Sequence, residues 1–348
     1  MMKTERIVIR SANWVGDAIM STPALRAVRR AFPGARITLL AKPWVIPIFE
    51  KSPDIDEIMV YEADGRHNGP LGLLRLAADI HRQRFDTAIL LQNAFEAALL
   101  AFMARIPRRI GFTTDARSLL LTDRINTWRP LKKGHLIDYY LGLMQGAGIA
   151  TRNKKLHLHI TPEETAEARR FLAETGTAEH QWVVGLNPGA AFGTAKRWLP
   201  ERYVELGRRL ADEHKAMILI FGSSSESQLG TQLATQIGPS CVNLSGHTSL
   251  RQAMALIGIC NLFITNDSGL MHVAAALDIP QVAIIGPTDP IATGPVNTLS
   301  RLVQKPESCH LSPCLKPHCP LKDHRCMTAI SVEMVMQTAL ALLPKHKR

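Results

Sequence analysis

One carboxylate stands where the chain is expected to leave its first strand. The apolar run RIVIR (residues 6–10) predicts a buried strand, and the segment SANWVGDAIM that follows contains Gly16 and Asp17. This turn has a single glycine and lacks the G-x-G-x-x-G pattern that holds a dinucleotide pyrophosphate. An aspartate here can be the N-cap of the next helix, but a carboxylate is unexpected where nucleotide-binding folds usually have glycine and phosphate.

Small residues and two cations follow an expected strand near the middle of the chain. The segment NPGAAFGTAKRWLPERY begins at Asn187 and contains Gly189, Thr194, Lys196 and Arg197. Small residues let the backbone approach a ligand, and backbone N–H groups together with a lysine make a cradle for phosphate. The alternative is a flexible loop with surface cations.

Two further turns of the second half carry polar groups. In FGSSSESQLG, the carboxylate of Glu226 either accepts hydrogen bonds from ribose hydroxyls or complements a helix dipole. In ITNDSGLMHVAAAL, the candidate ligands are Asp267, Ser268, Gly269 and His272. Backbone N–H groups, a hydroxyl and a histidine at a helix N-terminus favour a pyrophosphate. The alternatives are a helix cap at Asp267 or Ser268 and a packed core histidine at position 272.

The elements that must position these residues form two α/β series. Short apolar runs alternate with helix-like stretches, which is the pattern of βαβ units and a parallel sheet. The alternation weakens between residues 113 and 133 and then resumes. We expect two Rossmann-like domains, residues 1–160 and 161–348, with ligands at the carboxyl ends of the strands in a cleft between them. The last expected helix, residues 331–343, suits either half.

Composition describes a globular protein of 348 residues with 46% apolar and 20% charged residues. The net charge is +11, and eight Lys and Arg against two Asp lie between Arg105 and Lys133. Such a field attracts nucleic acid, an anionic membrane surface or a phosphorylated substrate, although a solvated basic face is the alternative. The N-terminal residues show no signal peptide, and residues 87–106 are too polar for a membrane span. We therefore expect a cytoplasmic protein with reduced cysteines.

Three segments together resemble a known enzyme family. GDAIMSTPALRAVRRAFP (16–33), PGAAFGTAKRWLPERY (188–203) and TNDSGLMHVAAAL (265–277) are similar, in order and spacing, to the ADP-heptose:lipopolysaccharide heptosyltransferases of glycosyltransferase family 9. The resemblance is greatest to the heptosyltransferase II group. Each segment alone is a weak signal, but the set is specific. It implies a GT-B fold, an α/β architecture of two Rossmann-like domains whose parallel sheets face a central cleft.

The resemblance also implies a reaction and roles for residues. It implies inverting transfer of L-glycero-D-manno-heptose from ADP-heptose to an inner-core heptose of nascent lipopolysaccharide, with no cofactor required. Asp17 matches the general base, and Lys196 matches the lysine that stabilises the leaving diphosphate. The turn that holds the donor on the second domain is matched by Asp267, Ser268, Gly269 and His272, and less securely by Glu226. Gly189, Thr194 and Arg197 complete the expected donor site.

The acceptor is expected on the first domain. An acceptor of the Kdo-lipid A type carries phosphates and a lipid, and its candidate ligands in the basic stretch are Arg105, Arg108, Arg109 and Arg117. The expected partners are therefore ADP-heptose, this acceptor and, transiently, the cytoplasmic surface of the inner membrane. Nucleic acid is not expected, because stacking platforms are scarce: aromatic residues make up 5% of the chain.

A cysteine-rich segment, CHLSPCLKPHCPLKDHRCM, departs from this pattern. Its four cysteines are Cys309, Cys314, Cys319 and Cys326. Their spacing is not the C-x-x-C of common zinc sites. We expect a reduced, proline-rich loop on the donor side and no metal; zinc or a cluster held by the four cysteines is the alternative.

Other functions stay open at this point. Within the family, the alternatives are a heptosyltransferase of type I or III and a transferase of a different sugar, since acceptor choice depends on loops of the first domain. Outside the family, the positive net charge is also compatible with a non-catalytic protein that binds nucleotides or nucleic acid. A Rossmann dehydrogenase is disfavoured by the missing G-x-G-x-x-G.

Overall fold

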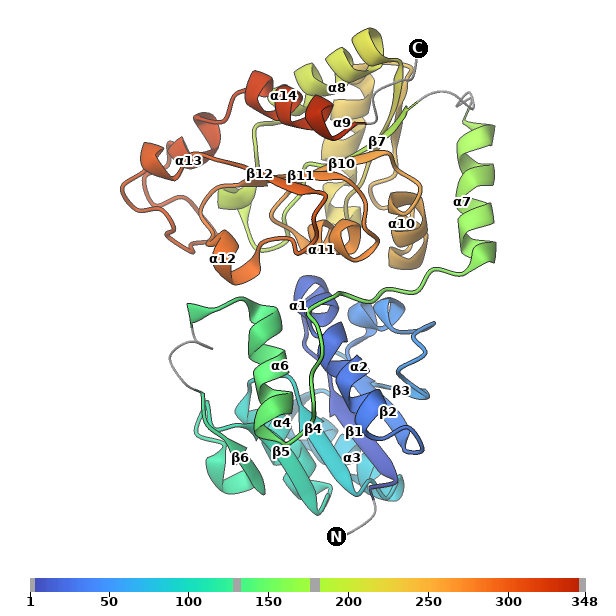
Figure 1. Ribbon diagram of the computed structural model, residues 1–348, viewed down its shortest axis with the longest axis vertical. Coiled ribbons are helices and arrows are strands. Elements are labelled where there is room, and N and C mark those ends of the chain that lie inside the picture. Colours follow the sequence, from blue (N-terminus) through green and yellow to red (C-terminus); the bar gives the residue numbers. More distant parts are fainter. Residues whose placement is uncertain (1–3, 128–132, 176–181, 344–348) are drawn as a thin grey trace. The chain divides into compact units, whose positions relative to one another are not determined.

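The computed structural model describes residues 4–127, 133–175 and 182–343 (Figure 1). The chain divides into two compact units, residues 1–159 and 160–348, and each is described by itself. Among the described residues, no helix has both the length and the apolar character needed to span a bilayer.

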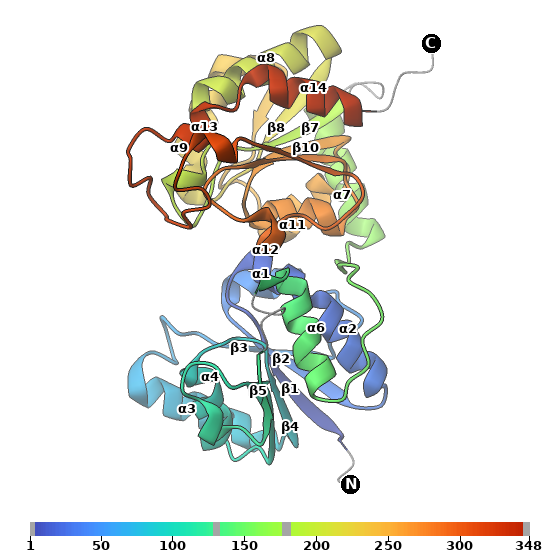
Figure 2. The same ribbon diagram turned by 60° about the vertical axis from the view of Figure 1, so that its left-hand side comes forward.

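The first unit is a six-stranded parallel sheet in the order β3-β2-β1-β4-β5-β6. Its strands are β1 (Arg6–Arg10), β2 (Arg36–Ala41), β3 (Glu57–Val60), β4 (Thr87–Leu90), β5 (Arg108–Phe112) and β6 (Asp123–Ile125). Its helices are α1 (Val15–Met20), α2 (Thr22–Ala31), α3 (Gly69–Arg82), α4 (Phe95–Met103) and α6 (Leu136–Gly146). Figure 2 shows α3 and α4 on one face of this sheet and α2 and α6 on the other. Strands covered on both faces require continuous apolar runs such as RIVIR.

The second unit repeats this architecture, with the parallel order β12-β11-β10-β7-β8-β9. Its strands are β7 (Trp182–Asn187), β8 (Ala216–Ile220), β9 (Cys241–Asn243), β10 (Leu262–Asn266), β11 (Gln281–Ile285) and β12 (Ser300–Gln304). Its helices are α7 (Pro162–Glu174), α8 (Pro200–His214), α9 (Ser227–Ile237), α10 (Leu250–Ile257), α11 (Gly269–Ala276), α12 (Pro290–Thr293), α13 (Arg325–Thr328) and α14 (Val332–Leu342). The last helix, which the sequence left unassigned, packs on α8 and on β10 to β12 of this unit.

Both sheets have the Rossmann strand order, which confirms the expected α/β class with two parallel sheets. The order reverses between β1 and β4 in the first unit and between β7 and β10 in the second. At such a switch point the two connections leave toward opposite sides, and a crevice opens beyond the carboxyl ends of the strands. The turns after β1, β7 and β10 are those that the sequence marked for chemistry.

Candidate active site

The switch point of the second sheet brings two of the predicted turns together. β7 and β10 are adjacent, with Asn187 opposite Thr265. The turn after β7 leads through a short 3-10 helix, η3 (Thr194–Lys196), to α8, whereas the turn after β10 leads directly into α11. The small residues of the first turn and the N-terminus of α11 therefore lie at the edge where open parallel sheets bind ligands.

Lys196 and Asp267 join these two turns. Lys196 Nζ donates to Asp267 Oδ2 at 2.8 Å, and the two side chains are only 14% and 6% exposed. Lys196 Nζ also lies 5.1 Å from the centre of the Phe192 ring. The lysine expected to meet a diphosphate is therefore already held by a carboxylate from the neighbouring turn. Nothing in the sequence spacing indicated that these two residues are paired.

Asn266, which the sequence analysis did not select, fixes the shape of the first turn. Its fully buried side chain donates from Nδ2 to the Pro188 carbonyl at 2.7 Å. Its Oδ1 accepts from the Trp198 N–H at 3.1 Å and from the Tyr203 hydroxyl at 3.0 Å. One amide thus ties both ends of the turn that carries Lys196 to the end of β10. The available signal was a polar residue closing the apolar strand LFITN, because a buried amide must find hydrogen-bond partners.

The turn after β10 is held in a similar way. Asn187 Nδ2 donates to Ser268 Oγ at 2.6 Å and to Thr265 Oγ1 at 3.0 Å. Ser268 occupies the N-cap position of α11, but its side chain makes no capping hydrogen bond. Gly269 is the first residue of the helix, and His272 lies buried one turn further on. The Ser268 hydroxyl is therefore committed to Asn187, while its position still marks a helix N-terminus.

Glu226 and Gly189 meet in the second unit. Glu226 Oε2 accepts from the N–H and the hydroxyl of Ser223, both at 2.8 Å, and closes a capping box at the 3-10 turn η4 (Ser224–Glu226). A Cβ at Gly189 would lie 2.0 Å from Glu226 Oε1, so only glycine leaves room for this carboxylate. Arg197 Nη2 lies 3.8 Å from the same oxygen. Glu226 thus stabilises a helix start, and a ribose contact stays a prediction.

Asp17 lies in the first turn of α1, as expected, but it is not the N-cap. Trp14 holds that position, and Asp17 follows three residues later with a half-buried side chain. Helix α6 packs against α1 and brings Tyr140 close. Burial raises the pKa of Tyr140 well above its usual value, and the Asp17 carboxylate raises it further. A neutral phenol therefore accompanies the carboxylate, and the N-cap alternative is wrong.

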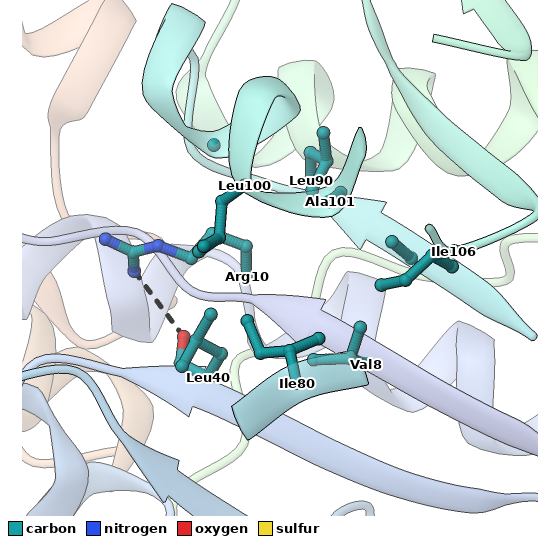
Figure 3. Close-up of a pocket in the computed structure, with 10 residues that line it drawn as sticks. Val8, Arg10, Leu40, Ile80, Leu90, Leu100, Ala101 and Ile106 are labelled. Carbon is teal, nitrogen blue, oxygen red and sulfur yellow. Dashed lines mark hydrogen bonds between the residues drawn. The ribbon is translucent and has the colours of Figure 1, made fainter. Parts of the chain in front are cut away.

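A buried arginine supports the turn before Asp17. Arg10 closes β1, and its guanidinium donates to the Ser11 carbonyl and to Asn13 Oδ1, both at 2.9 Å. Figure 3 shows the stem of Arg10 among apolar side chains and its guanidinium directed toward the Leu40 carbonyl. Burial lowers the pKa of Arg10 to about 10. The cavity beside this stem has a volume of about 10 Å³ and an apolar lining, so it holds no substrate.

Three of the four acceptor candidates lie at the opposite edge of the first sheet. Arg105 precedes β5, and Arg108 and Arg109 begin it, whereas Asp17 follows the carboxyl end of a parallel strand. Arg108 Nε pairs with Asp123 Oδ2 at 2.7 Å, and Arg109 Nε donates to the Leu120 carbonyl at 2.6 Å. Residues 128–132 of the basic stretch lie outside the described residues.

Arg117 lies at the correct edge but is fully buried. It donates to the carbonyls of Phe112 at 2.8 Å and Gln92 at 2.6 Å, and to Asn93 Oδ1 at 2.6 Å. This guanidinium joins the ends of β4 and β5 and is not accessible to an acceptor phosphate. A run of cations in the sequence does not tell which of them the fold uses internally, and we remove these four arginines from the acceptor site.

Comparison with known proteins gives concordant results. The sequence model of glycosyltransferase family 9 (heptosyltransferase) matches residues 73–324, which include both donor turns but not Asp17. The lipopolysaccharide heptosyltransferase 2 of Salmonella typhimurium is 33% identical over 314 residues, covering 86% of this chain and 88% of that protein.

Two solved structures are similar over nearly the whole chain. The ADP-heptose lps heptosyltransferase II of E. coli has a TM-score of 0.80 and 29% identity, covering 97% of this chain and 98% of the other. A glycosyl transferase family 9 protein from Veillonella parvula has a TM-score of 0.85 and 28% identity, covering 98% of each chain.

Proposed function

The chain belongs to glycosyltransferase family 9, the heptosyltransferases, and on that premise we propose that it transfers L-glycero-D-manno-heptose from ADP-heptose to an inner-core heptose of lipopolysaccharide, with inversion. Its two Rossmann-like units are those of a GT-B glycosyltransferase. The observation that carries the proposal is the Lys196–Asp267 pair at the switch point of the second sheet, beside the N-terminus of α11. Partly buried positive charge at a helix N-terminus suits a diphosphate.

The donor's diphosphate gains negative charge as the bond to the sugar breaks. Lys196 and the N–H groups at the start of α11 stabilise that charge, which strengthens only in the transition state. Asp267 holds the lysine in place until the donor arrives, and the diphosphate then shares the ammonium with it. Gly189 lets the backbone approach the donor. Arg197 and Glu226 lie beside Gly189 and contact the nucleoside of the donor in this proposal. In this proposal protein groups supply the positive charge, and no catalytic metal is invoked.

The acceptor hydroxyl loses a proton as it attacks the anomeric carbon from the face opposite ADP. Asp17 takes that proton. Two exposed indoles follow strands at the same edge of the first sheet: Trp14 is 58% exposed and Trp44 is 46% exposed. Trp44 Nε1 donates to the Asn13 carbonyl at 2.7 Å, and Lys42 Nζ lies 4.9 Å from the Trp44 ring centre. Flat apolar faces beside a cation suit a sugar that carries acidic groups, so these three residues replace the arginines as acceptor ligands.

The lipid of a Kdo-lipid A-type acceptor places the reaction at the cytoplasmic face of the inner membrane, with a transient surface contact. Nucleic acid is not a partner in this proposal. The alternatives are a type I or type III heptosyltransferase, which differs in the acceptor, and a family member that transfers another sugar, which differs in the donor.

The test is transfer by the purified protein from ADP-heptose to two core acceptors, one without heptose and one with a single heptose, read by mass spectrometry. We expect a gain of one heptose on the second acceptor alone. Transfer to the heptose-free acceptor would instead assign type I activity. No transfer to either, in a preparation that binds ADP, would refute the proposed substrates.

A further inference from the structure

Helix α4 is apolar on all sides, although only one of its sides is packed. Its sequence, FEAALLAFM, contains a single charged residue, Glu96. The side that packs on the first sheet buries Ala97, Ala98, Leu100 and Ala101. Phe95 and Phe102, two turns apart on the outer side, are 47% and 49% exposed. A helix that is apolar all round normally lies in a protein core or in lipid, so this outer side is suited to an apolar surrounding.

Helix α3 extends this exposed apolar surface. It packs against α4 on the same face of the first sheet (Figure 2). Leu71 and Leu74, near its start, are 70% and 54% exposed. Both helices follow strands of a parallel sheet, so their first turns lie at the carboxyl edge, where Asp17 also lies. Neighbouring helices that both expose large apolar side chains indicate an interaction surface.

Arginines border the apolar side chains. Arg75 directly follows Leu74 on α3, and Arg105 lies two residues after the end of α4; both are exposed. The Arg109 guanidinium lies 5.5 Å from the centre of the Phe102 ring. Apolar side chains interspersed with cations are the composition by which protein surfaces bind anionic lipid headgroups.

The acidic residues of the two helices have partners within the first unit. Asp79, the one acidic residue of α3, pairs with Arg66 at 2.9 Å and with Arg82 at 2.7 Å. Glu96, the one acidic residue of α4, accepts from the Tyr61 hydroxyl at 2.9 Å. These carboxylates therefore do not cancel the charge of the arginines that border the apolar side chains.

We propose that one face of the first unit docks on an anionic lipid bilayer. This α3–α4 face consists of Leu71, Leu74, Arg75, Phe95, Phe102 and Arg105. Its leucine and phenylalanine side chains enter the boundary between headgroups and acyl chains, and its arginines contact lipid phosphates. A soluble polyanion would leave the apolar side chains in water. A second copy of the chain, bound through the same face, would bring arginines against arginines.

Docking through this face would serve the reaction, and this part of the inference rests on the proposed function. An acceptor that carries a lipid is held in the bilayer, while its sugars extend from the surface. The exposed apolar side chains at the starts of α3 and α4 lie at the same edge of the first sheet as Asp17. The α3–α4 face would therefore bring the proposed base to the acceptor. Binding to lipid itself does not depend on the transferase activity.

The test is co-sedimentation of the purified protein with lipid vesicles, in the absence of donor and acceptor. One set contains phosphatidylcholine alone, and the other contains equal parts of phosphatidylcholine and phosphatidylglycerol. We expect the wild type to bind the anionic vesicles at least about tenfold more tightly. Phe95→Ser/Phe102→Ser should weaken that binding at least about tenfold, and Arg75→Gln/Arg105→Gln about 10–30-fold.

Matched control variants change the same kinds of residue in the second unit. Leu340→Ser replaces a 36% exposed leucine on α14. Arg169→Gln/Arg170→Gln removes two exposed arginines from α7. Both controls should bind anionic vesicles as the wild type does. A loss as large as that of the α3–α4 variants would show that binding follows overall charge or hydrophobicity, and would overturn the assignment to this face.

Two further outcomes would contradict the proposal. One is wild-type protein that binds neutral and anionic vesicles equally or binds neither. The other is a dimer in analytical ultracentrifugation that Phe95→Ser/Phe102→Ser abolishes, which would assign the face to a second copy of the chain. Turnover separates this proposal from the proposed function: the phenylalanine variant should keep wild-type turnover on an acceptor in detergent micelles and lose it on an acceptor in vesicles. A wild type that docks on anionic vesicles but transfers no heptose would refute the transferase and leave the docking face in place.

Discussion

Lys196 has two possible roles, as a ligand of the donor diphosphate and as the partner that holds Asp267 and the turn in place. Variants of the Lys196–Asp267 pair can separate these two roles. Lys196→Met keeps the length and apolar stem of the side chain but removes its charge. It also leaves the Asp267 carboxylate, which is only 6% exposed, without its partner. A loss of activity in this variant alone therefore has two explanations, a missing phosphate ligand or a disordered turn.

The expected magnitudes follow from burial. Removing one partner of a buried ion pair costs about 3–5 kcal/mol, and the 14% exposure of Lys196 places this case near the lower end. Asp267→Asn in the Lys196→Met background removes the uncompensated charge, so the double variant should recover to within about 1 kcal/mol of the wild type. Lys154→Met is a matched control, because Lys154 pairs with Asp138 while 57% exposed, and its loss should cost about 0–1 kcal/mol.

The assay is urea unfolding of the three variants and the wild type, with heptose turnover measured on each. Lys196→Met and the double variant should both lose about 10²–10³ in turnover, since neither has the ammonium that stabilises the leaving diphosphate. Stability should recover in the double variant and turnover should not. Recovery of turnover together with stability would show that Lys196 acts only by holding Asp267, and would remove it from the chemistry.

Three further predictions concern the two units separately. Asp17→Asn should reduce turnover by about 10²–10⁴ while leaving ADP binding intact, because the amide cannot accept the acceptor's proton; near-normal turnover would exclude Asp17 as the base. Gly193→Ala should weaken ADP binding, because a Cβ at this left-handed position (φ +154°) meets the Pro317 carbonyl, whereas Gly34→Ala, with no atom within 4 Å, should not; equal behaviour of the two would contradict the close packing. ADP should raise the melting temperature through linkage, and NADH or short DNA should not; stabilisation by NADH alone would contradict the transferase assignment.

The fold and the donor turns were predictable because they depend on local patterns. Buried parallel strands require apolar runs, and their carboxyl ends share one edge of the sheet. A polar or glycine-rich segment that follows such a run is therefore at the binding edge. This reasoning located the turns of Lys196 and Asp267 without knowledge of the strand order. The order itself, and hence the pairing of these two side chains, depends on contacts between segments about 70 residues apart.

The arginines show where sequence reasoning failed. Arg105 precedes β5, and Arg108 and Arg109 are its first two residues, so all three lie toward the amino end of the strand and away from the binding edge. Arg117 does reach that edge, but three carbonyl oxygens use its guanidinium. Charge density along a sequence does not distinguish an exposed cation from one that satisfies buried acceptors. Arg10 was missed for the same reason, since an arginine at the end of RIVIR resembles an ordinary surface residue.

The two switch points also explain why the first turn carries a carboxylate. A helix N-terminus attracts an anion. In the second unit, α11 begins with Gly269, and its first turn contains no acidic residue, so an external diphosphate can approach. In the first unit, the protein's own anion, Asp17, already lies in the first turn of α1, and Arg10 holds the preceding loop through Asn13. A phosphate there would meet like charge, whereas a neutral hydroxyl would meet an ionised base. The same strand order therefore positions a site for the leaving diphosphate in the second unit and the proposed base, Asp17, in the first.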